Sequence, residues 1–250
     1  MKKSIVLATA VAAVLTSGIA AAELSANAGI FSNYIWRGIS QTDDQAAGQG
    51  GIDWGHDSGL YVGTWVSNVA FPSVERNDTT GNVEDVLTGA GYEMDVYAGF
   101  AGEAGSIGYD LGVITYQYPI TPNFNFTELY VSGTMSIVTL GVNYTVDAAS
   151  GNEDGVFDTG DMYISGSLDF PVGKSDVSLY AGSYMFENDG TGANKVGGDA
   201  DYSNYGASIG KDGFTFAVDK STADSDNVVF GSEKSDNVRF TASYSVDFEL

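Results

Sequence analysis

The side chains of this chain that could do chemistry are mostly carboxylates, and they alternate with apolar residues. Glu93 and Asp95 flank Met94, and Asp247 lies between Val246 and Phe248. Because successive side chains of a strand point to opposite faces, this spacing gathers the charged groups on one polar face of a sheet. The set is Arg37, Asp53, Glu93, Asp95, Asp110, Glu128, Asp169, Asp219, Arg239 and Asp247. Such a face concentrates cations and repels anions.

The two arginines stand out because basic residues are scarce. Arg37 follows the first alternating segment, and we expect it to face the acidic side and to pair bidentately with a carboxylate such as Glu93, Asp95 or Glu128. The pair would either brace the wall of the fold or shape a constriction. Arg239 invites the same two interpretations.

Enzymatic chemistry is harder to assemble, because His56 is the only histidine. It lies in a predicted short turn, and no second general base accompanies it. We therefore predict that the protein is not an enzyme and interpret His56 as a turn residue.

One acidic loop resembles part of a calcium-binding loop. The segment from Ser150 to Asp161 has Asn and Asp two residues apart, then Gly, then later carboxylates. It departs from the pattern where Ser150 replaces the first Asp and Asp161 replaces the last Glu. We interpret it as a solvated loop, with weak divalent-ion binding next to lipid phosphates as the alternative, and we predict no cofactor and no dedicated metal site.

Strands must position these groups, and the last segment of the chain is the clearest of them. Residues 239–250 (RFTASYSVDFEL) alternate polar and apolar side chains throughout. A tilted strand that crosses a bilayer needs about 9 to 11 residues, which is longer than a typical strand of a soluble protein. The large apolar residues that end the chain resemble the C-terminal assembly signal of bacterial outer-membrane barrels.

The same alternation recurs through the mature chain, and we count about twelve strands separated by two kinds of connection. Short turns, such as residues 56–59 and 211–213, alternate with longer acidic loops, such as residues 67–89 and 187–201. The sequence therefore predicts an all-β fold, a transmembrane antiparallel up-and-down barrel with short periplasmic turns and long extracellular loops. Aromatic residues at the strand ends, including Tyr34 and Trp36 near the long loops, fit girdles at the two membrane interfaces.

The beginning of the chain predicts export. Lys2 and Lys3 precede an apolar run and then small residues that end at Ala22, the pattern of a signal peptide over residues 1–22. The barrel would then occupy residues 23–250. Removal of Lys2 and Lys3 leaves 8 basic against 33 acidic residues, a formal net charge of −25, which excludes nucleic acid as a partner. The chain has no cysteine, so it has no disulfide.

The segments from Ser32 to Thr42 (SNYIWRGISQT) and from Gly59 to Asn68 (GLYVGTWVSN) resemble the proteobacterial TorF-type family of porins. The segments from Glu93 to Gly99 and from Tyr116 to Pro119 are similar to later blocks of that family. The resemblance implies an outer-membrane β-barrel with a pore role. It carries over no substrate and no catalytic residue.

From these patterns we expect an outer-membrane porin that passes small solutes, with a preference for cations set by an acidic lumen. A closed barrel that acts structurally, or binds partners through its acidic loops, is the main alternative. A soluble periplasmic barrel would instead turn its apolar face inward. The expected partners are outer-membrane lipid and, during biogenesis, the barrel-assembly machinery, and the sequence leaves the oligomeric state open.

Overall fold

The computed structural model describes residues 23–70, 72–76, 83–87, 91–149, 157–187, 201–223 and 235–250. The predicted signal peptide, residues 1–22, lies outside these ranges, as do residues 150–156 of the loop that resembles a calcium-binding loop. Within the described ranges, no helix is long and apolar enough to cross a membrane.

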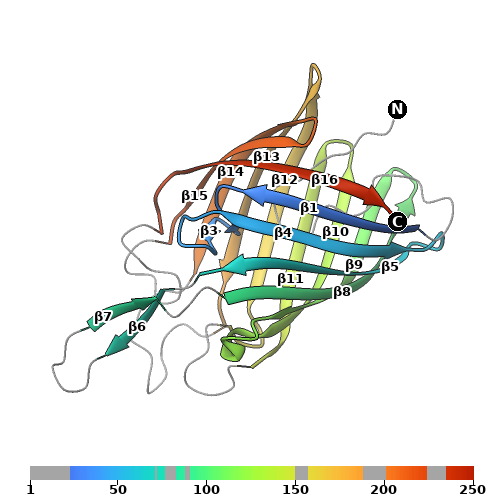
Figure 1. Cartoon of the computed structure of the whole chain (residues 1–250). Helices are drawn as coiled ribbons and strands as arrows, with labels where there is room; N and C mark the ends of the chain where they lie inside the picture. Colours follow the sequence, from blue (N-terminus) through green and yellow to red (C-terminus); the bar gives the residue numbers. More distant parts are fainter. Residues whose placement is uncertain are drawn as a thin grey trace.

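Twelve antiparallel strands close into one barrel, as the sequence predicts (Figure 1). The strands are β1 (Glu23–Phe31), β4 (Ala47–Gly55), β5 (Leu60–Val69), β8 (Gly91–Ala104), β9 (Ile107–Gln117), β10 (Phe126–Met135), β11 (Val138–Ala148), β12 (Met162–Val172), β13 (Ser175–Met185), β14 (Tyr202–Lys211), β15 (Phe214–Ser221) and β16 (Arg239–Glu249). Each barrel strand pairs with the next one along the chain, and β16 returns to β1, where Ala28 lies opposite Val246. This is an up-and-down barrel without a free edge.

Short and long connections alternate around the barrel, again as predicted. The five connections from β4 to β5, β8 to β9, β10 to β11, β12 to β13 and β14 to β15 have two to four residues, and the six others are longer. The turn Asp212–Gly213 shows why the short ones are tight, since its φ angles of 52° and 85° match a type I′ hairpin turn. Both chain ends of the barrel lie at this short-turn end, where Ser25 pairs with Glu249.

The longer connections contain secondary structure of their own. The first holds the hairpin of β2 (Ile35–Trp36) and β3 (Ile39–Ser40), and the second holds the hairpin of β6 (Pro72–Arg76) and β7 (Val83–Leu87). The connection from β9 to β10 contains the 3₁₀ turn η1 (Pro122–Phe124).

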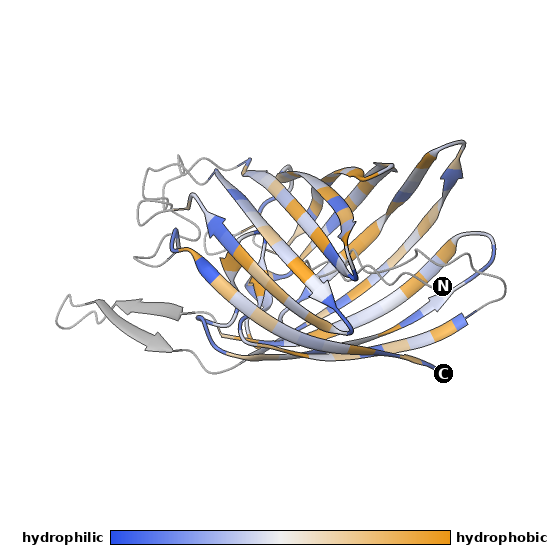
Figure 2. Cartoon of the chain, turned by 90° about the horizontal axis from the view of Figure 1, so that it is seen from above, coloured by the Kyte–Doolittle hydropathy of each residue, from blue (hydrophilic) through white to orange (hydrophobic). Residues whose placement is uncertain are grey.

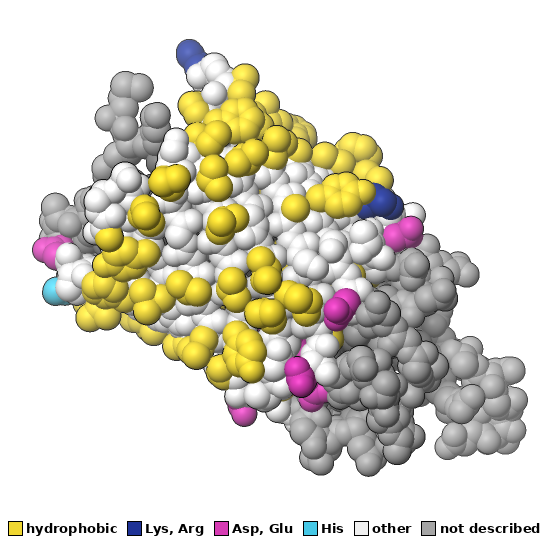
Figure 3. Space-filling model, turned by 180° about the vertical axis from the view of Figure 1, so that it is seen from behind, with side chains coloured by type: hydrophobic (Ala, Val, Ile, Leu, Met, Phe, Trp, Pro, Cys, Tyr) yellow, Lys and Arg dark blue, Asp and Glu magenta, His cyan; other side chains and the backbone are white. Residues whose placement is uncertain are grey.

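The outer wall of the barrel is apolar. Phe240 on β16 is 80% exposed and Leu140 on β11 is 64% exposed, although both strands are paired on both sides. Figure 2 shows hydrophobic residues interleaved along every strand, and Figure 3 shows apolar side chains spread over the wall with charged ones towards the ends. Trp54, Phe214 and Phe248 are exposed near the short-turn end, as the predicted girdle requires.

The girdle prediction is wrong for two aromatic residues. Tyr34 and Trp36 were expected to face outward near the long loops, but they are buried, with 3% and 7% exposure. They belong to the connection between β1 and β4, whose β2–β3 hairpin packs inside the barrel. An alternating pattern cannot distinguish lipid from an apolar layer in the lumen, because both favour the same residues.

Candidate functional site

The β2–β3 hairpin is built around a two-residue turn, Arg37–Gly38. The φ angles of these residues are 48° and 83°, and Trp36 pairs with Ile39 across the turn, so the geometry is that of a type I′ hairpin. Glycine is favoured at such positions, whereas arginine pays a backbone cost there. The tip lies against the wall, since a Cβ added to Gly38 would meet the Cβ of Asn204 on β14.

Arg37 is held inside the barrel by Glu128 of β10. Its Nη1 and Nη2 atoms donate to Glu128 Oε1 and Oε2 at 2.8 and 2.7 Å, and the two residues are 6% and 0% exposed. The guanidinium also lies over the rings of Trp36 and Tyr163, 4.2 and 4.4 Å from their centroids. Burial lowers the pKa of Arg37 and the Glu128 carboxylate raises it, with a net upward shift, so Arg37 stays charged. The predicted bidentate pair is confirmed, but Arg37 lies at a hairpin tip rather than at the end of the first strand.

Aromatic rings complete a layer around this ion pair. Trp36 meets Tyr116, Phe126, Phe157 and Tyr184 edge-on, with centroid separations of 5.9 to 6.1 Å. Tyr116 and Phe126 come from β9 and β10, whereas Tyr184 comes from β13 on another part of the wall. The hairpin and these rings therefore form a packed layer across the lumen at the long-loop end, which we call the plug.

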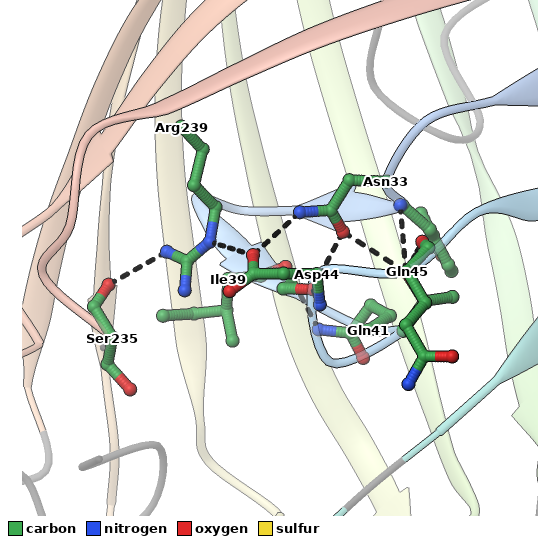
Figure 4. Close-up of polar contacts among 10 residues, drawn as sticks. Asn33, Ile39, Gln41, Asp44, Gln45, Ser235 and Arg239 are labelled. Carbon is green, nitrogen blue, oxygen red and sulfur yellow. Dashed lines mark hydrogen bonds and ion pairs between the residues drawn. The ribbon is translucent and has the colours of Figure 1, made fainter. Parts of the chain in front are cut away.

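A second ion pair attaches the segment after the hairpin to β16. Arg239 Nε donates to Asp44 Oδ1 at 2.7 Å, and Arg239 Nη1 donates to the Ser235 carbonyl at 3.1 Å (Figure 4). Asn33 Nδ2 also donates to Asp44 Oδ1, at 2.8 Å. Arg239, on β16, thus faces inward and binds Asp44 of the connection between β1 and β4, 195 residues away in sequence.

On the inner wall, three lumen carboxylates are bound by tyrosines in a repeated arrangement. Each tyrosine lies across a glycine of the neighbouring strand and donates its hydroxyl to an Asp of the strand beyond. The three groups are Tyr61–Gly99–Asp110, Tyr97–Gly63–Asp53 and Tyr180–Gly206–Asp219. Glycine is required under the ring, because an added Cβ would overlap it. These hydrogen bonds leave the carboxylates in place but satisfy part of their charge.

The predicted site residues thus form two levels. Arg37, Glu93, Asp95, Glu128 and Arg239 lie at the level of the plug, all at most 9% exposed. Asp219 lies beside Arg239, its register partner, and is 6% exposed. Asp53, Asp110, Asp169 and Asp247 lie on the inward face of their strands nearer the short turns, and Asp247 is exposed. Ser167 donates to Asp169 at 2.6 Å.

Within the first level, Glu93 and Asp95 differ from Glu128. Glu93 Oε1 accepts a hydrogen bond from the Tyr34 hydroxyl at 3.0 Å, whereas no residue in the described ranges donates to Glu93 Oε2 or to either oxygen of Asp95. Burial and the nearby Glu93 raise the pKa of Tyr34 well above its usual range, which keeps its hydroxyl a donor.

His56 is a turn residue, as interpreted from the sequence. It lies between β4 and β5, is exposed, and its Nδ1 lies 3.0 Å from Ser58 Oγ. The last residue of the calcium-like loop, Asp161, is also engaged: its two oxygens accept the backbone N–H groups of Asp158 and Glu187 at 2.8 and 2.9 Å. Burial raises the pKa of Asp161 to about 6.

Comparison with known proteins identifies a family and a fold. The family model described as "Bacterial protein of unknown function (Gcw_chp)" matches residues 16–248. A solved structure described as "Unveiling the Mechanism Behind the in-meso Crystallization of Membrane Proteins" has a TM-score of 0.51 at 10% identity, covering 91% of this chain and 84% of that one. No curated protein matches this chain.

Two porin structures are also similar in outline. The "KdgM porin" has a TM-score of 0.48 at 8% identity, covering 90% of this chain and 99% of that one. The "NanC porin" has a TM-score of 0.49 at 13% identity, covering 91% of this chain and 100% of that one.

Proposed function

The chain belongs to the Gcw_chp family of bacterial proteins of unknown function, and from that premise we propose that it is an outer-membrane porin for small solutes with a preference for cations. The resemblance of residues 32–42 and 59–68 to the TorF-type porins supports the same role. The protein would not be an enzyme, and its specificity would come from the charge of its lumen.

The observation that carries this proposal is the opposite polarity of the two faces of the barrel. The outer wall is apolar and exposed, whereas the inner wall holds eight carboxylates against Arg37 and Arg239. A barrel with an apolar exterior and a polar, wet interior is suited to a membrane, because lipid covers the outside and water the inside. Excess negative charge in a narrow, low-dielectric passage concentrates cations.

The alternation of short turns and long loops supports the orientation, and the apolar outer wall supports the location. We place the short turns and both chain ends of the barrel on the periplasmic side, and the long loops outside the cell. Residues 1–22 would direct export as a cleaved signal peptide, and the barrel-assembly machinery would insert residues 23–250 into the outer membrane. Lipid is then the permanent partner of the apolar wall, and nucleic acid has no role.

The plug adds a condition to this function. Because Trp36, Arg37 and the rings around them fill the lumen at one level, conduction requires the β2–β3 hairpin to leave its place. We therefore propose that this conformation is the closed state of the pore. Opening would break the ion pair between Arg37 and Glu128 and expose the aromatic layer to water, so open intervals should be rare.

Planar-bilayer recording tests the proposal, with wild type compared with a variant in which a Gly-Ser linker replaces residues 35–40. We expect rare openings of the wild type and frequent openings of the variant. In a salt gradient, we expect the reversal potential of the open channel to show selectivity for cations over anions. As a matched control for selectivity, Asp53→Asn and Asp110→Asn should be added to the linker variant, which should weaken the cation preference. An anion preference would refute the electrostatic mechanism.

A closed barrel is the second candidate, and the plug is the observation that favours it. In that case the barrel anchors its loops at the cell surface and passes nothing. If the linker variant folds, as judged by a heat-shifted gel band, and still shows no unitary conductance, this second function replaces the first.

A further inference from the structure

The pair Glu93 and Asp95 on β8 is a buried acidic site that the proposed pore does not explain. The two residues point into the lumen at alternate positions of the strand and are 1% and 0% exposed. Their carboxyl groups lie within hydrogen-bonding reach of each other. A buried carboxylate without a counter-charge is costly, by several kcal/mol per ion.

No described basic side chain supplies that counter-charge. The nearby guanidinium of Arg37 is fully engaged by Glu128, which also accepts hydrogen bonds from Asn143 at 3.0 Å and Tyr116 at 3.3 Å. The ion pairs of Lys211, Lys220 and Arg239 involve other carboxylates. When both are ionised, Glu93 and Asp95 carry two negative charges that no cationic side chain of the described residues balances.

Three oxygen atoms of this pair are unsatisfied hydrogen-bond acceptors among the described residues. Glu93 Oε2 and the two oxygens of Asp95 are buried, and no described residue donates a hydrogen bond to them. Phenol oxygens surround them: the Tyr34 hydroxyl binds Glu93 Oε1, and the Tyr118 hydroxyl interacts with the same carboxyl group. The ligand set consists only of oxygen, which suits hard cations and not zinc or copper.

We propose that Glu93 and Asp95 bind one hard divalent cation, for which Ca²⁺ is the best match. A charge of two balances the two carboxylates. Ca²⁺ accepts irregular oxygen coordination and bidentate carboxylates, whereas Mg²⁺ keeps its water in a strict octahedral shell that a dry site does not accommodate. Within the described residues, no three His, Cys, Asp or Glu side chains converge on one point, so the two carboxylates would share the ion with phenol oxygens.

The position of the site gives the ion a structural effect. Glu93 and Asp95 belong to the wall, Tyr34 lies at the entry of the β2–β3 hairpin, and Tyr118 belongs to the connection from β9 to β10. An ion bound between them ties the plug to the wall. Bound Ca²⁺ would therefore stabilise the folded barrel with its plug in place.

Terbium luminescence tests the inference on the folded protein in detergent, independently of any conduction. Tb³⁺ replaces Ca²⁺ at oxygen sites, and Trp65, which pairs with Asp95 on the neighbouring strand, provides a nearby sensitiser. We expect Tb³⁺ emission upon excitation of the aromatic residues, its displacement by Ca²⁺ but weakly by Mg²⁺, and a rise of the thermal unfolding midpoint with Ca²⁺.

Two isosteric variants locate the site. Asp95→Asn and Glu93→Gln should each weaken Tb³⁺ binding at least about tenfold and abolish the Ca²⁺ effect on unfolding, because each removes one of the two charged ligands. Asp53→Asn is the matched control, since Asp53 is a lumen carboxylate already bound by Tyr97. Emission that persists unchanged in both variants would place the ion elsewhere on this acidic chain and overturn the proposal. The absence of any Ca²⁺ response in the folded wild type would overturn it as well, in favour of a shared proton.

Discussion

Replacement of Arg37 by Asn isolates the contribution of the buried ion pair. Asn adopts positive φ angles more readily than Arg does, so Arg37→Asn keeps the hairpin turn at φ 48° while it removes the guanidinium. Loss of one partner of a buried ion pair costs about 3 to 5 kcal/mol, because the other charge stays buried. Relief of the backbone returns about 1 kcal/mol, and Glu128 keeps its hydrogen bonds from Asn143 and Tyr116. We expect a net loss of about 3 kcal/mol of unfolding free energy.

Urea unfolding in detergent micelles, followed by tryptophan fluorescence, measures this loss. The ring centroid of Trp36 lies 4.2 Å from the guanidinium carbon of Arg37, so Trp36 reports the plug once the Trp54→Phe and Trp65→Phe changes are made in every variant. The matched control is Glu128→Gln in the Arg37→Asn background, where no unpaired charge remains. We expect the double variant to recover about half of the loss, that is, roughly 1.5 kcal/mol, because the uncompensated charge is gone.

Two results would refute this reasoning. If Arg37→Asn is as stable as wild type, the ion pair contributes no more than the strain of its own turn. If Glu128→Gln makes the single variant worse, the cost does not come from an unpaired carboxylate, and the aromatic contacts of Arg37 must account for the effect instead.

Three further predictions concern the wall and the loops. Val246→Lys should lower the yield of refolding into vesicles, read as the heat-shifted gel band, because a lysine facing lipid near the midplane costs about 2 to 4 kcal/mol; Ser245→Lys faces the lumen and should refold normally, and equal yields would contradict the assigned faces. Gly206→Ala places a Cβ about 2.5 Å from the ring of the lumen tyrosine that crosses it and should cost about 1 to 3 kcal/mol, measured by urea unfolding, whereas Gly48→Ala meets nothing within 4 Å and should be neutral. The folded state raises the pKa of Asp161 to about 6, so ionisation is disfavoured and stability should fall as pH rises from about 4 to about 6; Asp161→Asn should flatten this dependence in unfolding curves, and an unchanged slope would assign it to other groups.

The barrel could be predicted from the sequence because its rules are local. Alternation of period two fixes which residues of a strand share a face, and Gly, Asn and Asp mark the short turns. The terminal segment 239–250 shows this well: its apolar residues, such as Phe240 and Phe248, lie on the outer wall, and its polar ones face inward. The number of strands and the closure of β1 on β16 then follow from counting segments.

The plug could not be predicted in the same way, because its contacts are distant in sequence. Arg37 and Glu128 are 91 residues apart, and nothing local in residues 34–39 tells an aromatic residue in the lumen from one in lipid. Gly38 did carry a signal, since Gly at the second position of a two-residue turn between short strand-forming segments is typical of a hairpin. Arginine at the first turn position masks that signal, as Asn or Asp is usual there.

The sequence identified the inner carboxylates, but it did not identify the tyrosines that bind them. A list of acids opposite an apolar register predicts a charged lumen, whereas Tyr61 and Tyr180 each donate a hydrogen bond to one of those acids. The glycines opposite were the available signal, because a residue without a side chain on a lumen face leaves room for a ring from the next strand. The effective charge that a passing ion meets is therefore smaller than the count of carboxylates, and the cation preference should be moderate.

The segment between β1 and β4 is held in the lumen against its own local preferences. Arg37, Asp43 and Asp44 all have positive φ angles, of 48°, 50° and 58°, and each such residue other than glycine is unfavourable. Two ion pairs with distant strands, at Glu128 and Arg239, offset this cost. A segment attached to the wall by side-chain contacts separates from it more easily than a strand paired on both sides does. This is the property that a plug needs if the barrel around it is to stay intact while the passage opens.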